Sequence, residues 1–388
     1  MDGIYFDNAA TSFPKARGVG RAVKDLLDGG AFNVGRGGYG GAYALSSQVL
    51  DTRERLRRLF SAPADSSVCF TAGVTQSVNQ FLKGTLRPVD HIVVSSVEHN
   101  AVMRPLHTLA QTGVAFSVAE CAADGTLDPE RVRACFRGNT RAVLCTHASN
   151  VCGTILPVGA VGALCRERGI WFAVDAAQTA GICPIDMEAM GIDFLAFPGH
   201  KGLRGPQGVG GFVVRNALAE IMIPLIEGGT GSRSDSEVQP DFLPDRFESG
   251  TLPLPAIVGL RQALTVLEED GITAGYLREM ELTARFLEGL RAIPQARVAG
   301  IADLERISQR LGVVSVDFSP FDNAWMAFAL EQDAGIMTRV GLHCAPRAHQ
   351  TLGTFPRGTV RFSFGPENTL REVDDCIRSI QSVLKKEN

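Results

Sequence analysis

The sequence lacks the features that mark several large classes of protein. No stretch of its 388 residues approaches the roughly 18 consecutive apolar residues of a membrane-spanning helix. The 42 Asp and Glu outnumber the 38 Lys and Arg, so no positive excess is available to bind nucleic acid or an anionic membrane. Apolar residues (45%) and charged residues (21%) are near globular averages, which excludes a disordered tail, a collagen and a coiled coil. At about 150 residues per domain, we expect two or three domains.

Cysteine chemistry is limited in the same way. The nine cysteines form no C-x-x-C pair and no grouping with His at the spacing of a zinc site, so we expect no metal. The opening MDGIYFDNAAT has no basic region, long apolar run or cleavage site of a signal peptide. These absences predict a cytoplasmic protein with reduced thiols, most of them buried in the core.

Glycine, by contrast, is abundant: 42 of 388 residues, roughly 11% against a usual share of about 7%. Such an excess indicates many tight turns and many positions where the backbone closely approaches something else. It favours a ligand-binding α/β enzyme.

Short apolar runs alternate with helical patterns between about residues 65 and 215. The runs are Val68–Phe70, Ile92–Val94, Ala115–Val118, Ala142–Cys145, Trp171–Val174, Phe194–Phe197 and Gly211–Val214. The helical stretches between them are Ser77–Leu86, Val102–Gln111, Pro129–Phe136 and Val158–Arg168. This alternation predicts a doubly wound parallel sheet, and the continuous apolar runs indicate that helices cover both of its faces.

The pattern changes after this region. Residues 228–256 are rich in Gly, Pro and Ser and predict an irregular, functional segment. A helical stretch follows over residues 256–290, broken by Gly271, and short strands and helices over 295–388 predict a smaller α+β domain. We expect a large domain over residues 15–260 and a small domain formed by residues 1–14 and 261–388.

Polar residues follow five of the predicted strands, at the edge of the sheet where ligands bind in open parallel sheets. They lie in Thr71–Ser77, Glu98–Asn100, Thr146–Asn150, Asp175–Gln178 and at Lys201. The start of a helix at Gly73–Ser77 is typical either of an ordinary N-cap or of a phosphate cradle. Asp175 is either another cap or the partner of a cationic ring nitrogen. Lys201 is either a surface lysine or, between glycines, a Schiff-base lysine. Together they provide what pyridoxal phosphate needs: a phosphate anchor, a pyridinium partner and an imine-forming amine.

Seven motifs in order make the sequence resemble the cysteine desulfurase family of the class V aminotransferases over nearly its whole length. They are Ile4–Thr11, Val97–Ala101, His147–Thr154, Val174–Gln178, Gly199–Lys201, Arg246–Thr251 and Gly341–Ala345. The 17-residue interval from Cys344 to Arg361 is similar to that of the group with a short cysteine loop. The resemblance implies an aspartate-aminotransferase-like fold (pyridoxal-phosphate fold type I). In this fold a large doubly wound, mainly parallel-sheet domain is joined to a smaller α+β C-terminal domain, and the protein is a homodimer.

The resemblance also implies a cofactor site for pyridoxal 5'-phosphate. Lys201 is expected to bind it covalently, Asp175 to keep its ring nitrogen protonated, and His99 to stack on the ring and move protons. The other expected cofactor contacts are Asn150 and Gln178 to the phenolic oxygen, and Val74, Thr75, His200 and, from the partner subunit, Thr251 to the phosphate. Pro198 stands where relatives often have Ser, which removes one phosphate hydroxyl, and Gly35 stands where many carry His.

The substrate implied by the resemblance is L-cysteine, which the enzyme converts to L-alanine while Cys344 accepts the sulfur as a persulfide. Arg361 is expected to bind the substrate carboxylate, with Arg339, Asn150 and Ala10 beside it. Only a thiolate is competent, so we expect an electropositive setting for Cys344, supplied by His343 and Arg339. A protein is a candidate for the final sulfur acceptor, whose identity stays open. A selenocysteine lyase and another class V reaction such as transamination are alternatives, and a non-catalytic binding module is a third.

Overall fold

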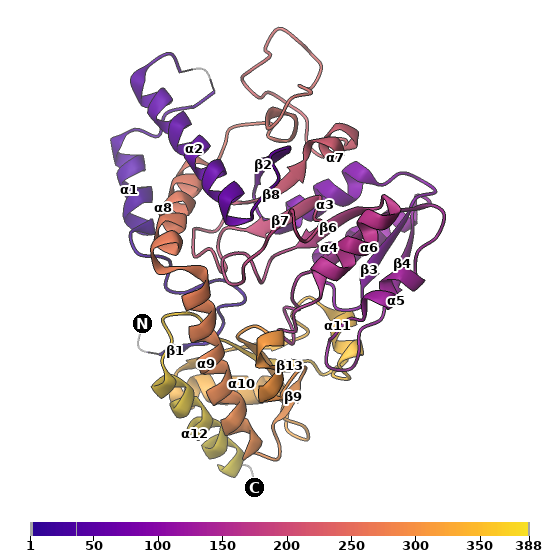
Figure 1. Ribbon diagram of the computed structural model, residues 1–388. Coiled ribbons are helices and arrows are strands. Elements are labelled where there is room, and N and C mark those ends of the chain that lie inside the picture. The colour runs from indigo at the N-terminus through magenta and orange to yellow at the C-terminus, as the bar shows by residue number, and fades with distance from the viewer. Residues whose placement is uncertain (1–2, 36, 387–388) are drawn as a thin grey trace.

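The computed structural model describes residues 3–35 and 37–386. It has a larger part built around a seven-stranded sheet and a smaller part built around a four-stranded sheet, and both ends of the chain lie at the smaller part (Figure 1). None of the described helices is long and apolar enough to span a membrane.

The large domain holds the seven-stranded sheet in the order β2-β8-β7-β6-β5-β3-β4. Its strands are β2 (Ser66–Thr71), β3 (His91–Ser95), β4 (Ala115–Ala119), β5 (Thr140–Thr146), β6 (Trp171–Asp175), β7 (Phe194–Pro198) and β8 (Gly210–Arg215). Its helices are α1 (Val19–Gly29), α2 (Gly40–Leu59), α3 (Val74–Thr85), α4 (Asn100–Ala110), α5 (Pro129–Ala134), α6 (Val158–Arg168), α7 (Asn216–Ile221) and α8 (Leu254–Asp270), with the 3₁₀-helix η1 (Asp245–Phe247). All seven predicted apolar runs are therefore strands.

The sheet is mainly parallel, as the resemblance implied, with one strand that runs the other way. β3 to β7 are parallel, but β8 runs antiparallel to both of its neighbours, β7 and β2. The reason is the connection 199–209, which contains no helix, whereas a parallel return needs a crossover of about a dozen residues or more, usually a helix. Since β2 is antiparallel to β8, it runs in the direction of the parallel strands, and its carboxyl end lies at the same edge.

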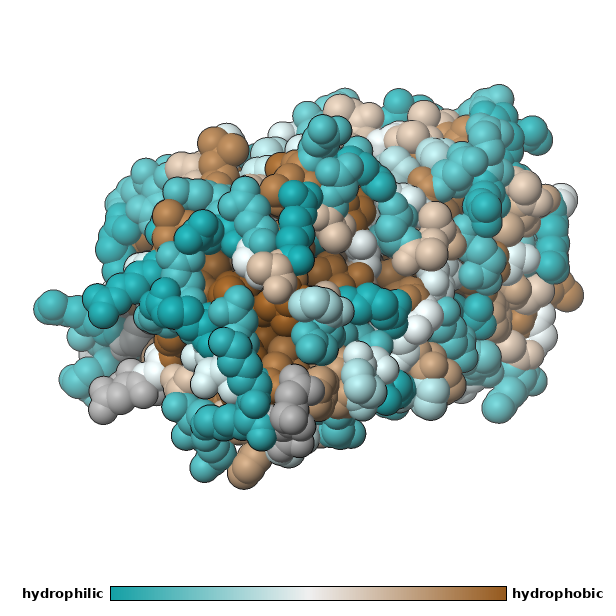
Figure 2. Space-filling model, turned by 90° about the horizontal axis from the view of Figure 1, so that it is seen from below, coloured by the Kyte–Doolittle hydropathy of each residue, from teal (hydrophilic) through white to brown (hydrophobic). Residues whose placement is uncertain are grey.

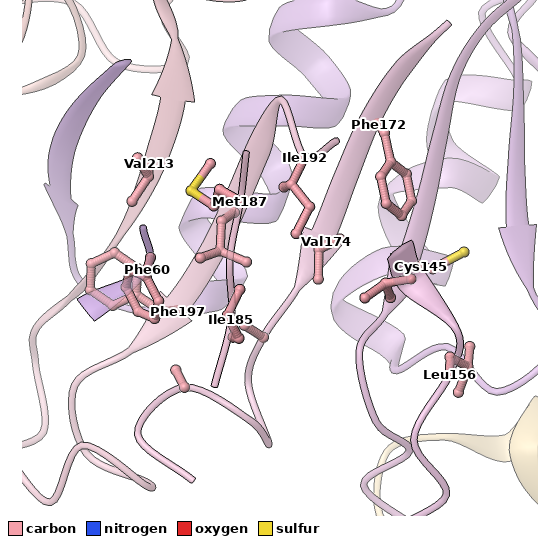
Figure 3. Packing of buried hydrophobic residues seen from close by; sticks show 14 of the residues in the cluster. Phe60, Cys145, Leu156, Phe172, Val174, Ile185, Met187, Ile192, Phe197 and Val213 are labelled. Atoms are coloured by element: carbon pink, nitrogen blue, oxygen red, sulfur yellow. The ribbon is translucent and has the colours of Figure 1, made fainter. Parts of the chain in front are cut away.

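Helices cover both faces of the sheet, as the apolar runs predicted. Alternate residues of one strand belong to different cores: Val93 packs on one face, and Ile92 and Val94 on the other. Residues of α2, α5, α6 and α8 form the first core and residues of α3, α4 and α7 the second. Figure 3 shows part of the first core, in which Phe172 and Phe197 extend from neighbouring strands. Burial of these side chains fixes the strands and therefore the positions of their ends.

The small domain is an antiparallel sheet in the order β12-β13-β10-β9, with a short parallel pair, β1 and β11, beside it. Its strands are β1 (Ile4–Tyr5), β9 (Arg297–Ala299), β10 (Val313–Asp317), β11 (Ile336–Met337), β12 (Arg339–Gly341) and β13 (Thr359–Ser363). Its helices are α9 (Ile272–Arg291), α10 (Asn323–Ala334), α11 (Pro346–Thr351) and α12 (Leu370–Lys386), with the 3₁₀-helix η2 (Leu304–Gln309). Seen from this end, the surface is mostly hydrophilic, with apolar residues showing in the hollows (Figure 2).

The two domains meet at Gly271, which separates α8 from α9 with a φ of 78°. Leu260 and Leu264 of α8 pack into the first core of the large domain, and Phe286 of α9 packs into the small-domain core. Phe6, near the start of the chain, also lies in the small-domain core. The packing therefore changes at Gly271, while the division of the chain at residue 260 stays a prediction.

Candidate active site

The carboxyl ends of the parallel strands bring the predicted polar residues to one edge of the sheet. Asp175 ends β6 and pairs with Thr146, the last residue of β5, and with Ala196 of β7. Several charged side chains lie close enough to Lys201 to change its pKa, namely Asp175, Arg361, Arg339 and Asp7. The pKa of His99 is changed in turn by the charges of Lys201, Arg339 and Arg361. The site thus combines large-domain and small-domain residues.

Asp175 is a buried carboxylate without a cationic partner. It is only 2% exposed, and its Oδ1 accepts one hydrogen bond, 2.8 Å long, from the backbone N–H of Ala177. No ion pair to it occurs among the described residues. Burial raises its pKa, and the hydrogen bond and the charge of Lys201 oppose this only in part. A buried carboxylate of this kind fits a cationic group such as a protonated ring nitrogen.

Lys201 follows β7 in a glycine-rich loop and is half-buried. Burial lowers the pKa of its amine to about 8, against the opposing charge of Asp175, so a free amine is accessible near neutral pH. The glycines beside it are required by the close approach of other backbone segments. A Cβ on Gly199 would lie 2.7 Å from the carbonyl oxygen of Val209, and one on Gly202 would lie 2.5 Å from that of Ala180.

A helix start with free backbone N–H groups lies beside this loop. The N-cap of α3 is Gly73, which offers no side chain, and the N–H groups of Val74 and Thr75 have no acceptor among the described residues. A Cβ on Gly210 would lie 2.9 Å from Gly73 Cα, and Gly210 pairs with Pro198 at the end of β7. Free N–H groups and the helix dipole attract a phosphate. The hydroxyl that Pro198 lacks is not replaced by Ser77, which is buried, 2.9 Å from Thr71 Oγ1.

His200 is held from the other side by the first residues of the chain. Its Nδ1 lies 3.1 Å from Thr11 Oγ1, and its carbonyl oxygen accepts hydrogen bonds from Thr11, Ser12 and Lys15. Burial lowers the pKa of Lys15 to about 8. Sequence reasoning missed Thr11 and Lys15, although the opening motif that contains Thr11 was already part of the resemblance.

His99 and Glu98 occupy the turn after β3. His99 caps α4, because its Nδ1 accepts the N–H of Ala101 at 3.0 Å, and burial together with the charge of Lys201 lowers its pKa to about 4. The ring is therefore neutral, with its proton on Nε2. Glu98 is fully buried and accepts hydrogen bonds from Ser95 Oγ (2.6 Å) and the N–H of Thr146 (2.8 Å), and burial raises its pKa to about 8. Sequence reasoning did not assign Glu98 this role of linking the ends of β3 and β5.

Cys344 lies in a strained, accessible loop that is fixed to the large domain. It is exposed, whereas the other eight cysteines are buried or partly buried. Cys344 and His343 both adopt left-handed backbone angles (φ 58° and 49°), which are unfavourable for residues other than glycine. The N–H of Asn100 donates to the carbonyl oxygen of Cys344 at 2.8 Å, and Asn150 Nδ2 donates to that of His343 at 2.8 Å.

The expectation that His343 gives Cys344 a positive setting is wrong. The His343 ring points into the protein, where it is buried and its Nε2 lies 3.1 Å from Thr359 Oγ1. Burial and the charge of Arg361 lower its pKa to about 2, so the ring carries no charge at neutral pH. Arg339 forms no ion pair among the described residues and stays available to supply positive charge.

Arg361 lies on β13 directly across from Arg339 on β12. It is 1% exposed, and its terminal nitrogens donate to Asp7 Oδ1 (2.7 Å) and to the carbonyl oxygen of Asn150 (3.1 Å). Asp7 was not among the residues that sequence reasoning selected for the site. Ala10, three residues after Asp7, donates its N–H to the carbonyl oxygen of Asp7, and Gln178 Nε2 donates to that of Ala9 (3.3 Å).

Thr251 stands apart from these residues. It is exposed in the loop before α8 and lines a hollow with Asn33 and Gly229. No hydrogen bond among the described residues joins it to Lys201 or to the start of α3. The preceding segment is fixed by Glu248, which is paired with Arg53 at 2.6 Å.

Fold and site together define an α/β enzyme with a lysine of lowered pKa at a sheet edge. The family model of the class-V aminotransferases matches residues 4–376, and the chain belongs to that family. It is 32% identical over 377 residues to a probable cysteine desulfurase of Methanothermobacter thermautotrophicus, covering 96% of this chain and 92% of that protein.

Solved structures agree with this assignment. A cysteine desulfurase from Thermococcus onnurineus, solved in its apo form, superposes with a TM-score of 0.90 at 29% identity, covering 99% of this chain and 95% of that one. The cysteine desulfurase CsdA of Escherichia coli superposes with a TM-score of 0.87 at 28% identity, with the same coverage. The family resemblance and the fold class predicted from the sequence are confirmed.

Proposed function

We propose that this protein is a pyridoxal-phosphate-dependent cysteine desulfurase, which converts L-cysteine to L-alanine and transfers the sulfur to Cys344. The observation that carries the proposal is the position of an exposed cysteine, Cys344, on a loop hydrogen-bonded to Asn100, the residue after His99. The relatives named cysteine desulfurases support it over nearly the whole chain.

The donor set fits pyridoxal phosphate. Asp175 offers an unpaired buried carboxylate for the ring nitrogen, and Lys201 offers an amine whose pKa is about 8. The start of α3, at Val74 and Thr75, offers free N–H groups for the phosphate. The remaining contacts that we propose are those of His99 with the ring, of Asn150 and Gln178 with the phenolic oxygen, and of His200 and the partner's Thr251 with the phosphate. When bound, the cofactor supplies an aldehyde for a covalent link and a ring that takes up electrons from the substrate Cα.

The protein groups then divide the work. Lys201, as a free amine, accepts the α-proton of the substrate on Nζ. Arg361, with Arg339, Asn150 and Ala10 beside it, binds and orients the substrate carboxylate, a role that suits a planar guanidinium. The Cys344 thiolate attacks the substrate sulfur. An S–S bond forms as the Cβ–S bond breaks, and Cβ gains a proton to become the methyl group of alanine. Cys344 is left as a persulfide, which an acceptor thiol or protein removes.

A second copy of the chain completes the site in this proposal. Large apolar side chains are exposed on α1, α2 and the segment 223–242, which project together in Figure 1. They include Leu27, Tyr39, Tyr43, Leu50, Ile223, Ile226, Val238 and Phe242. Exposed apolar side chains on neighbouring segments favour an interface, and Thr251 lines a hollow with residues 229–232 of one of these segments. We infer a homodimer in which Thr251 reaches the partner's phosphate site.

One experiment tests the function. The protein is loaded with pyridoxal phosphate, the absorbance band of the bound cofactor is recorded, and L-cysteine is added with a reducing thiol. Equal amounts of L-alanine and sulfide are expected. The same assay with L-selenocysteine separates a selenocysteine lyase, for which selenide release would exceed sulfide release. Amino-group transfer to a 2-oxo acid without sulfide would instead identify a transaminase. A protein that binds no chromophore would point to a binding module.

A further inference from the structure

Asp7, in the opening motif, forms an ion pair with a buried arginine. Its Oδ1 lies 2.7 Å from Nη2 of Arg361, which is 354 residues further along the chain and only 1% exposed. Because the guanidinium is buried and the carboxylate side chain is 21% exposed, solvent screens this pair less than a surface pair. Asp7 therefore acts directly on the charge of Arg361.

The orientation of Arg361 does not depend on Asp7 alone. Its Nη1 donates to the carbonyl oxygen of Asn150 at 3.1 Å, and its side chain is enclosed by protein. Its Nε is buried and has no hydrogen-bond partner among the described residues. Two other constraints, packing and a backbone carbonyl, therefore hold the guanidinium in place.

The local charges explain why a carboxylate is present here. Arg339 and Arg361 face each other across β12 and β13, an arrangement that is unfavourable for like charges. Lys201 adds a third positive group, and burial lowers the pKa of Arg361. Only two carboxylates, Asp175 and Asp7, are among the main charges acting on Lys201. With Asp175 facing the ring nitrogen, Asp7 is the counter-ion of the arginine pair.

We propose that Asp7 determines how strongly the site binds carboxylates, by acting as an internal competitor for Arg361. This inference rests on the proposed function, in which Arg361 binds the substrate's α-carboxylate. The incoming carboxylate meets a guanidinium already paired with a carboxylate, and the repulsion between the two weakens its binding. The penalty applies equally to every carboxylate, so contacts with the rest of the ligand supply a larger share of its binding.

Weak binding of the carboxylate is useful to such an enzyme. The α-carboxylate is unchanged during the reaction, so tighter binding lowers KM without raising kcat. L-alanine carries the same α-carboxylate, so tighter binding of this group would slow the release of the product. Asp7 therefore favours turnover over retention of product.

Two variants test the proposal, Asp7→Asn and Asp7→Ser, with Asp333→Asn as the matched control. This control variant loses an ion pair of similar length, 2.8 Å between Asp333 and Lys386, on the exposed surface. In the loaded enzyme, KM for L-cysteine and the inhibition constant of L-alanine are expected to fall together, by about fivefold or more, with no rise in kcat. The control is expected to match the wild type. A rise in KM for both variants would show that Asp7 merely holds Arg361 in place, and would overturn the proposal.

A second readout needs no cofactor. Thermal unfolding of the cofactor-free proteins is followed in acetate and in chloride of equal ionic strength. Acetate is expected to stabilise Asp7→Asn and Asp7→Ser more than the wild type, because it replaces the missing counter-ion. Equal stabilisation of all proteins would contradict the proposal, and Asp7→Ser decides if Asp7→Asn does not fold. If the wild type makes no alanine from cysteine, the proposed function fails, whereas the acetate titration still decides the role of Asp7.

Discussion

Lys201 and Cys344, the two residues to which we assign the covalent chemistry, lie in opposite surroundings. Lys201 follows a central strand, where burial lowers its pKa to about 8. Cys344 is exposed on a loop with left-handed backbone angles, held to the large domain by Asn100 and Asn150. An amine becomes reactive near neutral pH through desolvation, whereas a thiol that must pass sulfur to an acceptor needs access. The site therefore has a buried half at the sheet edge and an accessible half on the small domain.

The largest expected effect comes from removing the amine of the buried half. Lys201→Ala is expected to lower alanine production about 10³-fold or more, because no other group can both link the cofactor and accept the α-proton. Loss of the cofactor's absorbance band should accompany it. Lys385→Ala, at an exposed position of α12, is the control. If Lys201→Ala keeps wild-type turnover, the buried half of the site is not needed for catalysis, and the division of the site into two halves is refuted.

A smaller effect is expected at Asp175. Asp175→Asn keeps the side-chain shape but removes the charge for the ring nitrogen, so affinity for pyridoxal phosphate should fall about 10- to 100-fold in an equilibrium titration. The cofactor-free variant should be more stable than the wild type at pH 7. Burial raises the pKa of Asp175 in the folded state, so its ionisation costs stability as pH rises above the unfolded value. Unchanged cofactor affinity would contradict the role of Asp175.

Asn150 tests the connection between the halves. Asn150→Ala removes the 2.8 Å hydrogen bond to the carbonyl oxygen of His343, and kcat for sulfide release is expected to fall about tenfold. Asn139→Ala, which removes a 2.6 Å bond to the carbonyl oxygen of Val89 far from the site, is the matched control. If Asn150→Ala leaves kcat unchanged, the anchoring of the loop is not needed for catalysis.

The smallest effect is expected on stability, at the domain junction. Glu279 on α9 is 6% exposed, faces the cleft between the domains and has a pKa raised to about 8 by burial. A raised folded-state pKa means that stability falls as pH rises from about 4.5 toward 8. Glu279→Gln should therefore melt a few degrees higher than the wild type at pH 8 and equally at pH 4. Glu288→Gln, at an exposed position of the same helix, should change neither value.

The buried half could be read from the sequence because its signals are local. Each strand is a short apolar run, and the polar residues that follow within a few positions, such as Asp175 and Lys201, lie at the sheet edge. The direction of β8 has no such local signal, because it depends on the connection before the strand, which contains no helix. The glycines around Lys201 were noticed, but the backbone groups that they approach belong to distant segments.

The half of the site on the small domain was harder to predict because its contacts span the chain. The pair Asp7–Arg361 joins residues 354 positions apart, and nothing in either local pattern indicates the partner. β12, which carries Arg339, has three residues and no apolar run. His343 follows Leu342 in a polar loop, and only the fold shows that its ring turns inward to Thr359 and loses its charge.

The most direct measurement of the central claim is mass spectrometry of the peptide that contains Cys344, after single-turnover reaction with L-cysteine and trapping of thiols. The account predicts one added sulfur atom on Cys344 in the wild type, none in Lys201→Ala, and no sulfur on the eight other cysteines. In Cys344→Ala, the cofactor's absorbance band should persist while alanine is no longer formed. Added sulfur on another cysteine, or alanine production by Cys344→Ala at the wild-type rate, would contradict it.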